Sequence, residues 1–161
     1  CSSGLFGSKN WSTRWYAFAR GIGGHVIMQK IGILNSHIAK VLSDLGHTDQ
    51  ITIGDCGLPV PDNVLKIDLA LTLGKPEFIE VVKEVAKYMQ VERIYVAKEM
   101  EIQNPTQWKA LHSVFPVTEV EWVVLSEHEE FKKMTKQSKA IIRTGEITPF
   151  SNVIFESGVI F

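Results

Sequence analysis

Residues 65–97, LKIDLALTLGKPEFIEVVKEVAKYMQVERIYVA, contain two different hydrophobic periods in one short stretch of chain. From Leu65 to Thr72, apolar and polar residues alternate, which is the pattern of a strand with one buried face. After Gly74-Lys-Pro76, which places proline in the first turn of a helix, apolar residues recur at helical spacing: Phe78, Ile79, Val82, Val85, Ala86 and Met89. The run from Ile94 to Ala97 is typical of a buried strand. This order predicts one unit of an α/β sheet.

Helix and strand patterns continue to alternate on both sides of this stretch. The other predicted strands are 51–53, 120–125, 140–143 and 153–155. The other predicted helices are 36–45, capped by Asn35-Ser36, a short helix from Asn104-Pro105, and 128–137, opened by a capping box at Ser126-Glu127-His128-Glu129. We therefore predict a single α/β domain, a three-layer α/β/α sandwich with a mixed, mostly parallel sheet, because the terminal strands can be antiparallel.

The first 27 residues differ in composition from the rest of the chain. They hold three of the 17 basic residues, five of the 12 glycines and no acidic residue. Regular periodicity starts only after Met28, so we predict that the domain spans residues 28–161 and that residues 1–27 are an extension. Three interpretations of this extension are a cloning-derived or read-through segment, a leader similar to a transit peptide, and an interaction arm with aromatic anchors.

The composition narrows the class of protein. Of 161 residues, 45% are hydrophobic, 17 are Lys or Arg and 18 are Asp or Glu. A net charge of −1 argues against general binding to nucleic acid or to a membrane surface. No apolar run reaches the roughly 18 residues that a membrane span needs, and two cysteines do not make a disulfide framework. We expect a cytoplasmic protein with no nucleic-acid or membrane partner.

The sequence lacks the short motifs that announce a cofactor. It contains no phosphate-binding loop, no GxSxG elbow, no HExxH and no CxxC. Gly21-Ile-Gly23-Gly24 does not match a dinucleotide fingerprint and lies in the extension. We therefore expect no cofactor and no metal, although a zinc site built from His47, Asp55 and His128 stays an alternative.

Three polar side chains next to predicted strands and helices are candidates for chemistry. Asp55 follows the strand 51–53, and ligands of open α/β sheets bind beyond the carboxyl ends of strands; alternatively, it caps the next turn. His47 follows the first helix, where it could act as an acid or base or satisfy the last helix carbonyls. His128 would lie in the first turn of a helix, as a neutral hydrogen-bonding group or a plain surface residue. Glu99 could line the same crevice, but the segment 98–101 is expected to be a solvated loop.

Several ordered motifs resemble one family. Leu45-Gly-His-Thr-Asp49 and Asp55-Cys-Gly-Leu-Pro-Val-Pro61 are similar to the opening of the D-ribose pyranase family, whose relatives are the fucose mutarotases. Ile142-Arg-Thr-Gly-Glu146 and Pro149-Phe-Ser-Asn152 continue the likeness in register. The resemblance covers residues 28–161 and none of the first 27.

The resemblance implies a cofactor-free, cytoplasmic isomerase that interconverts the pyranose and furanose forms of D-ribose for ribose utilisation. It implies that His47 is the catalytic acid, which protonates the ring oxygen, and that the sugar is bound by Asp55, His128, Phe150, Ser151 and Asn152. It also implies a homo-oligomer, commonly a decamer of two stacked pentamers, with sites close to subunit contacts. The family usually has tyrosine where this chain has Phe150, so a phenolic hydroxyl is missing. An L-fucose mutarotase and a non-catalytic sugar-binding module remain alternatives.

Overall fold

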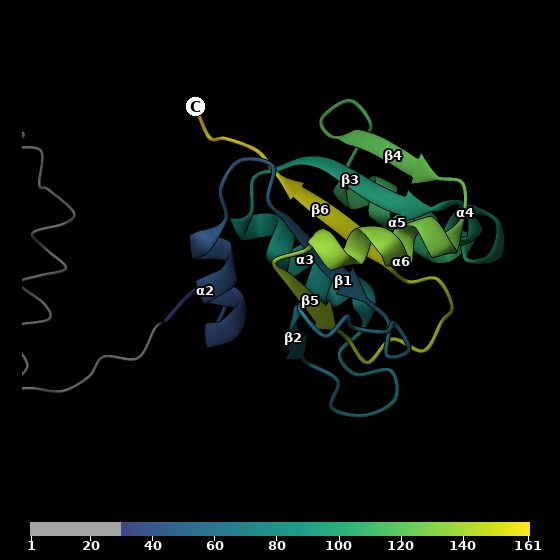
Figure 1. The fold of residues 1–161 in the computed structure, drawn as a ribbon, viewed down its shortest axis with the longest axis horizontal. Coiled ribbons are helices and arrows are strands. Elements are labelled where there is room, and N and C mark those ends of the chain that lie inside the picture. Colours follow the sequence, from purple (N-terminus) through teal and green to yellow (C-terminus); the bar gives the residue numbers. More distant parts are fainter. Residues whose placement is uncertain (1–29) are drawn as a thin grey trace, which may run out of the picture. The chain divides into compact units, whose positions relative to one another are not determined.

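In this computed structural model, which describes residues 30–161, six strands form one sheet (Figure 1). They are β1 (Gln50–Gly54), β2 (Leu65–Asp68), β3 (Val91–Ala97), β4 (Glu121–Leu125), β5 (Ala140–Arg143) and β6 (Val153–Ser157). Their order across the sheet is β2-β5-β1-β6-β3-β4. Only β6 runs antiparallel to its neighbours, so the predicted mixed, mostly parallel sheet is confirmed. The predicted extension 1–27 lies outside the described residues.

Helices cover both faces of the sheet, which confirms the predicted three layers (Figure 1). They are α2 (Ser36–Asp44), α3 (Phe78–Tyr88), α4 (Lys98–Gln103), α5 (Pro105–Val114) and α6 (His128–Met134), which a 3₁₀ turn over Thr135–Gln137 extends. In Figure 1, α6 crosses in front of the sheet, whereas α3 and α5 lie behind it. None of the helices within residues 30–161 is long and apolar enough to cross a bilayer.

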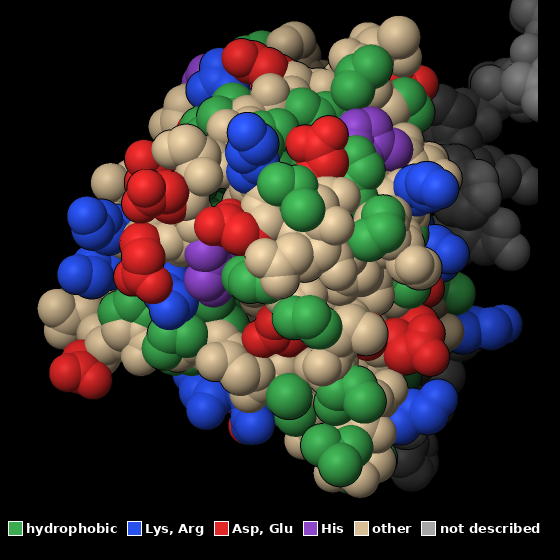
Figure 2. Space-filling view, turned by 90° about the vertical axis from the view of Figure 1, so that its right-hand side faces the viewer, with side chains coloured by type: hydrophobic (Ala, Val, Ile, Leu, Met, Phe, Trp, Pro, Cys, Tyr) green, Lys and Arg blue, Asp and Glu red, His purple; other side chains and the backbone are tan. Residues whose placement is uncertain are grey.

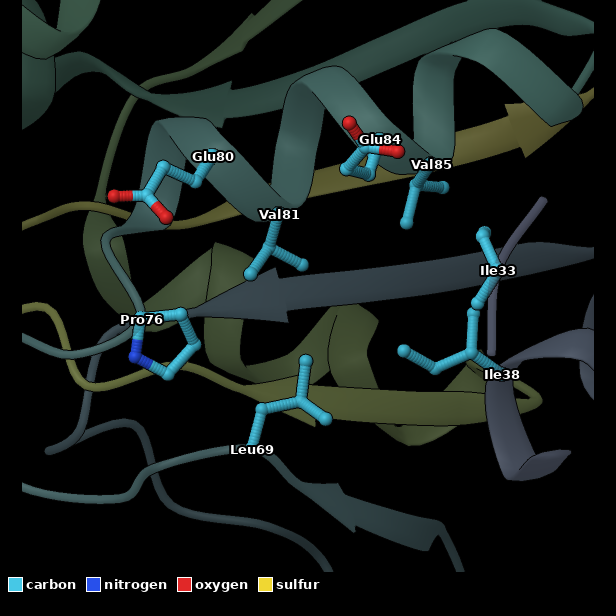
Figure 3. Close-up of a pocket in the computed structure, with 8 residues that line it drawn as sticks. All are labelled: Ile33, Ile38, Leu69, Pro76, Glu80, Val81, Glu84 and Val85. Carbon is cyan, nitrogen blue, oxygen red and sulfur yellow. The ribbon is translucent and has the colours of Figure 1, made fainter. Parts of the chain in front are cut away.

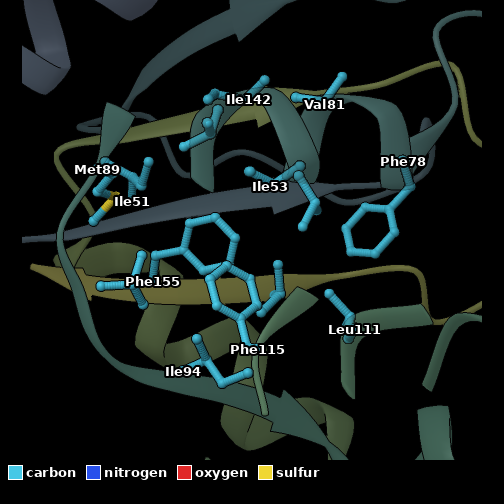
Figure 4. Close-up of a cluster of buried hydrophobic side chains, with 14 of the residues drawn as sticks. Ile51, Ile53, Phe78, Val81, Met89, Ile94, Leu111, Phe115, Ile142 and Phe155 are labelled. Carbon is cyan, nitrogen blue, oxygen red and sulfur yellow. The ribbon is translucent and has the colours of Figure 1, made fainter. Parts of the chain in front are cut away.

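The larger hydrophobic core lies between the sheet and the α3 and α5 layer (Figure 4). Ile51 and Ile53 of β1 are fully buried there, because alternate residues of a strand point to the same face. The ring of Phe155 meets the ring of Phe115 edge-on at 5.1 Å between centroids. Phe131 of α6 anchors a smaller cluster on the opposite face. The sheet is therefore packed on both faces, and this packing supports the loops at the ends of its strands.

The local signals at two helix starts behave as predicted. The side chain of Asn35 accepts a hydrogen bond from the Ile38 N–H and caps α2. Asn104 caps α5, and Pro105 is its first residue. Both caps satisfy backbone N–H groups that have no partner inside the helix.

Four local predictions are wrong. The strand predicted to reach Thr72 ends at Asp68, and the chain turns back so that Thr72 bridges Lys75, which leaves Leu71 85% exposed. The reason is that β5, the neighbour of β2, ends at Arg143 opposite Asp68, so no partner strand continues. Pro76 consequently lies before α3 and not in its first turn.

The segment 98–101 is helical and not a solvated loop, because Met100 is fully buried and ties α4 to the core. The predicted capping box is also displaced. Glu127, and not Ser126, is the N-cap of α6, and the Ser126 hydroxyl donates to the Glu130 carboxylate at 3.0 Å. The backbone N–H of His128 instead donates to Glu99, which replaces a local cap.

Candidate functional site

The topology brings polar residues from three segments to the carboxyl end of β1. Because β6 is antiparallel to β1, with Val153 opposite Ile53, the loop before β6 lies beside the chain that leaves β1. The Asp55 N–H accordingly donates to Oδ1 of Asn152 at 3.0 Å. Figure 2 views the edge of the molecule toward which the parallel strands point, where histidine, acidic and apolar side chains lie next to one another.

Asp55 lies in a tight, partly buried corner. Its Oδ1 accepts the Gly57 N–H at 3.0 Å, so the turn-capping role considered for it is real and coexists with its place in the site. Burial raises the pKa of the Asp55 carboxyl, although the N–H groups of Gly57 and Leu58, the His128 ring and Asn152 each act to lower it. Gly54 makes this corner possible, because a Cβ there would lie 2.5 Å from Leu58 Cδ2 and 2.9 Å from Asn152 Oδ1.

Replacing Asp55 by asparagine is expected to raise the thermal unfolding midpoint at pH 7. A carboxyl whose pKa is higher in the folded chain than the ordinary 3.8 destabilises the fold where it is ionised, and has no effect below 3.8, where both states are protonated. The Asp55→Asn side chain removes the charge and keeps an oxygen for the Gly57 N–H. Thermal unfolding at a series of pH values should therefore show a gain that shrinks as the pH falls toward 3.8. A lower midpoint for the variant at pH 7 would contradict this reading.

His128 is the first residue of α6 and lies between two aromatic rings. Its ring stacks on Phe131 at 5.9 Å and meets Phe150 edge-on at 5.1 Å between centroids. Burial lowers the pKa of His128, and the Lys132 charge acts in the same direction, while Glu99, Asp55 and Glu129 act to raise it. A lowered pKa favours the neutral imidazole, and burial is the main cause. A neutral ring can donate one hydrogen bond and accept another.

Hydrogen bonds from the start of α5 hold the loop that carries Phe150, Ser151 and Asn152. Asn104, which caps α5, donates from Nδ2 to the Pro149 carbonyl at 2.8 Å and to the Ser151 hydroxyl at 3.2 Å. The Ser151 side chain is fully buried and also bonds to the Thr148 carbonyl, so its hydroxyl serves the loop itself. Phe150 adopts a left-handed backbone with φ of 58°. The sequence analysis uses Asn104-Pro105 only as the start of a helix. It does not predict the hydrogen bonds from Asn104 to this loop.

A buried glutamate ties the same loop to two helices. Glu146 accepts hydrogen bonds from Gln107 Nε2 of α5 at 3.0 Å and from the Thr148 hydroxyl at 2.6 Å. Its other oxygen lies 3.4 Å from the Phe78 N–H, at the start of α3. A charged side chain that is only 7% exposed needs such partners. Glu146 thus helps to hold the loop before β6 in one conformation.

His47 does not join this cluster within one chain. It precedes β1, whereas Asp55 follows β1, and the five residues of that strand span about 17 Å. Its Nε2 lies 3.0 Å from Glu92 Oε2, and about half of each side chain is exposed. The zinc alternative therefore fails within a single chain. Residues 30–161 contain no group of three or more His, Cys, Asp or Glu side chains that could hold a metal ion.

A separate apolar groove lies between α2, α3 and the chain that follows β2 (Figure 3). Its volume is about 310 Å³, and Ile33, Ile38, Leu69, Pro76, Val81 and Val85 line it together with Glu80 and Glu84. None of the predicted site residues lines it. The candidate site is therefore the polar cluster at the end of β1 and not this groove.

The cluster combines groups that suit a polyhydroxylated ligand. Asp55 supplies a carboxylate, His128 a neutral imidazole and Asn152 a side-chain amide, next to the apolar ring of Phe150. Carboxylates accept strong hydrogen bonds from hydroxyl groups, and an aromatic wall can cover the apolar face of a ligand.

Comparison with known proteins shows which family the chain resembles. Residues 28–160 match the RbsD / FucU transport protein family. A protein of Staphylococcus haemolyticus named D-ribose pyranase is 57% identical over 134 residues, which are 83% of this chain and all of that protein. The structure of Bacillus subtilis RbsD complexed with D-ribose has a TM-score of 0.79 and 52% identity, covering 83% of this chain and 100% of that one.

A more distant structure shares the fold. The fucose mutarotase from Streptococcus pneumoniae in complex with L-fucose is 18% identical, with a TM-score of 0.62, over 79% of this chain and 94% of that one. The match to the family covers all described residues but the last, and the identity to several relatives exceeds half of the aligned residues. The chain belongs to the RbsD / FucU family.

Proposed function

We propose that this protein is a D-ribose pyranase, a cytoplasmic isomerase that interconverts β-D-ribopyranose and β-D-ribofuranose without a cofactor. The observation that carries the proposal is the 52% identity, over the full length of that chain, to a protein whose structure was determined with D-ribose. The polar cluster of Asp55, His128 and Asn152 supports it, because these groups can bind sugar hydroxyls.

The proposed reaction needs little more than a proton donor and a fixed sugar. Changing the ring size requires the open-chain aldehyde, so the ring oxygen gains a proton as its bond to C1 breaks, and the anomeric hydroxyl loses one. After bond rotation, a different hydroxyl attacks the carbonyl carbon. In the proposal His47 donates the proton to the ring oxygen, since a histidine can serve as acid in one direction and as base in the other.

The remaining residues of the proposed site hold the sugar. Asp55 accepts a charge-assisted hydrogen bond from a hydroxyl group, and His128 and Asn152 orient the ring. Phe150 contributes an apolar surface, and Ser151 contributes by fixing the loop. Phe150 has no hydroxyl to offer, so the sugar gains ring contact there and no hydrogen bond from that side chain.

A catalytic His47 requires a second copy of the chain. Within one chain, β1 separates His47 from Asp55, so the imidazole that reaches a given sugar has to come from a neighbour. The exposure of His47 and Glu92 leaves this end of β1 available to a neighbouring copy. The proposal therefore includes a homo-oligomer, and the decamer implied by the family resemblance is the assembly we propose.

Saturation-transfer NMR on D-ribose with catalytic amounts of protein tests the function. We expect exchange between β-pyranose and β-furanose signals to become faster than in buffer. The same measurement on the anomers of L-fucose is the matched control, because a fucose mutarotase would accelerate that exchange and leave the ring size of ribose unchanged. Ribose exchange at the buffer rate, with ribose still bound, would leave a non-catalytic binding module.

A further inference from the structure

Glu99 and His128 are joined across two helices that both begin at this edge of the sheet. Glu99 belongs to α4, which directly follows β3, and His128 is the first residue of α6, just after β4. The carboxylate oxygen Oε1 of Glu99 accepts the backbone N–H of His128 at 3.0 Å. No side chain from the preceding residues caps α6, so Glu99 supplies the acceptor that a local cap ordinarily supplies.

This pair leaves two buried polar atoms without partners among the described residues. They are Oε2 of Glu99 and Nδ1 of His128. A buried polar atom without a hydrogen bond is destabilising, and folded proteins almost always give it a partner, either a protein group, a water molecule or a ligand. A hydroxyl group is a suitable partner for either atom, because a hydroxyl donates to a carboxylate oxygen and accepts from an N–H.

We infer that Glu99 has two roles in the sugar site: one carboxylate oxygen fixes His128 at the start of α6, and the other, like Nδ1 of His128, binds a hydroxyl group. The inference rests on the proposed function in so far as the hydroxyl belongs to a sugar. A water molecule offers the same hydroxyl chemistry, and the two sources differ in whether ribose binding depends on Glu99.

The charge of Glu99 has a second consequence for the imidazole. The groups that act on His128 are Glu99 from α4, Asp55 from the end of β1, and Glu129 and Lys132 from α6 itself. Burial and Lys132 lower the pKa of His128, and the three carboxylates oppose them. Removing the Glu99 charge therefore lowers the pKa of His128 further, and the acidic limb of any activity that needs the neutral ring moves to lower pH.

The Glu99→Gln variant tests the inference with the fold preserved. Its amide oxygen still accepts the His128 N–H, whereas the second acceptor and the charge are lost. We expect an about tenfold weaker affinity for D-ribose, the effect of one hydrogen bond to a charged group. NMR titration of the His128 ring protons should also show a lower pKa. Glu101→Gln, an exposed acid of the same helix, is the matched control and should change neither quantity.

The results with Glu99→Gln distinguish a failure of this inference from a failure of the proposed function. An unchanged ribose affinity with a lowered His128 pKa would assign the hydroxyl to water and overturn the binding part of the inference. If the Glu99→Gln variant lost thermal stability and left both affinity and titration unchanged, Glu99 would be purely structural and the inference would be wrong. Absence of ribose exchange in the wild-type protein would defeat the proposed function, while the NMR titration would still test the role of Glu99.

Discussion

Replacing His47 by alanine is expected to slow ribose ring exchange by about 10²–10⁴-fold, the usual contribution of a general acid or base. The fold should be unaffected, because the side chain is half exposed and its hydrogen-bond partner Glu92 is equally exposed. Saturation transfer on D-ribose measures the rate, and the unfolding midpoint checks the fold. Full activity in the His47→Ala variant would remove His47 from the mechanism.

Mixed assemblies test whether the site forms between copies. His47→Ala and Asp55→Asn chains should each be inactive alone. When they are unfolded together and reassembled, some sites combine a wild-type His47 from one copy with a wild-type Asp55 from another, so activity should return in part. A mixture of Asp55→Asn with His128→Ala is the control, since both changes affect the same edge and no complete site can form. Equal behaviour of the two mixtures would contradict a shared site.

Gly145→Ala is expected to have the largest effect on stability. A Cβ at this position would lie 2.2 Å from the carbonyl oxygen of Lys75 and 2.5 Å from its carbon. The two segments are tied by hydrogen bonds, from the Gly74 N–H to the Gly145 carbonyl and from the Gly145 N–H to the Pro76 carbonyl. Because both sides are backbone, neither can move aside by a change of rotamer. We expect a loss of about 3 kcal/mol, the upper end for overpacking.

The effect of Gly145→Ala is measured by thermal or denaturant unfolding. Gly46→Ala is the matched control, because the nearest atom to a Cβ there, Asp49 Oδ2, is 3.5 Å away in ordinary contact. Ribose affinity should fall together with stability in Gly145→Ala, since the same loop leads to Phe150 and Asn152. A variant with the wild-type unfolding midpoint would mean that the Lys75 turn yields more readily than its hydrogen bonds suggest.

Helices whose hydrophobic residues recur at a clear helical spacing were predictable from the sequence, and helices without such a spacing were not. The stripe of α3 and the cap at Asn35 are local signals, so they needed no knowledge of the rest of the fold. The helix α4 has six residues and a single fully buried one, Met100, which is too little for a period to emerge. The strand predicted beyond Asp68 has a clear alternation but does not form. A strand also needs a neighbour to pair with, and pairing is a tertiary property.

The site was predictable only in part for a similar reason. Asp55 follows a strand, so its place at a carboxyl edge could be inferred from order along the chain. The order of elements also allowed Glu99 to line the crevice, but its hydrogen bond to His128 and those of Asn104 to the loop join separate segments, so no local pattern predicts them. His47 was a candidate from its place after the first helix, and the family resemblance implied its catalytic role, but its separation from Asp55 becomes plain only when both ends of β1 are seen together.

The place of β6 has a consequence for how the protein is made. This strand, Val153–Ser157, lies in the middle of the sheet, between β1 and β3, yet it follows the other five strands along the chain. Because synthesis proceeds from the amino terminus, the nascent chain exposes two unpaired strand edges until residues 153–157 leave the ribosome. Open edges of this kind invite pairing with other chains. A chain that ended before Val153 would therefore be expected to aggregate and not to form a smaller working domain.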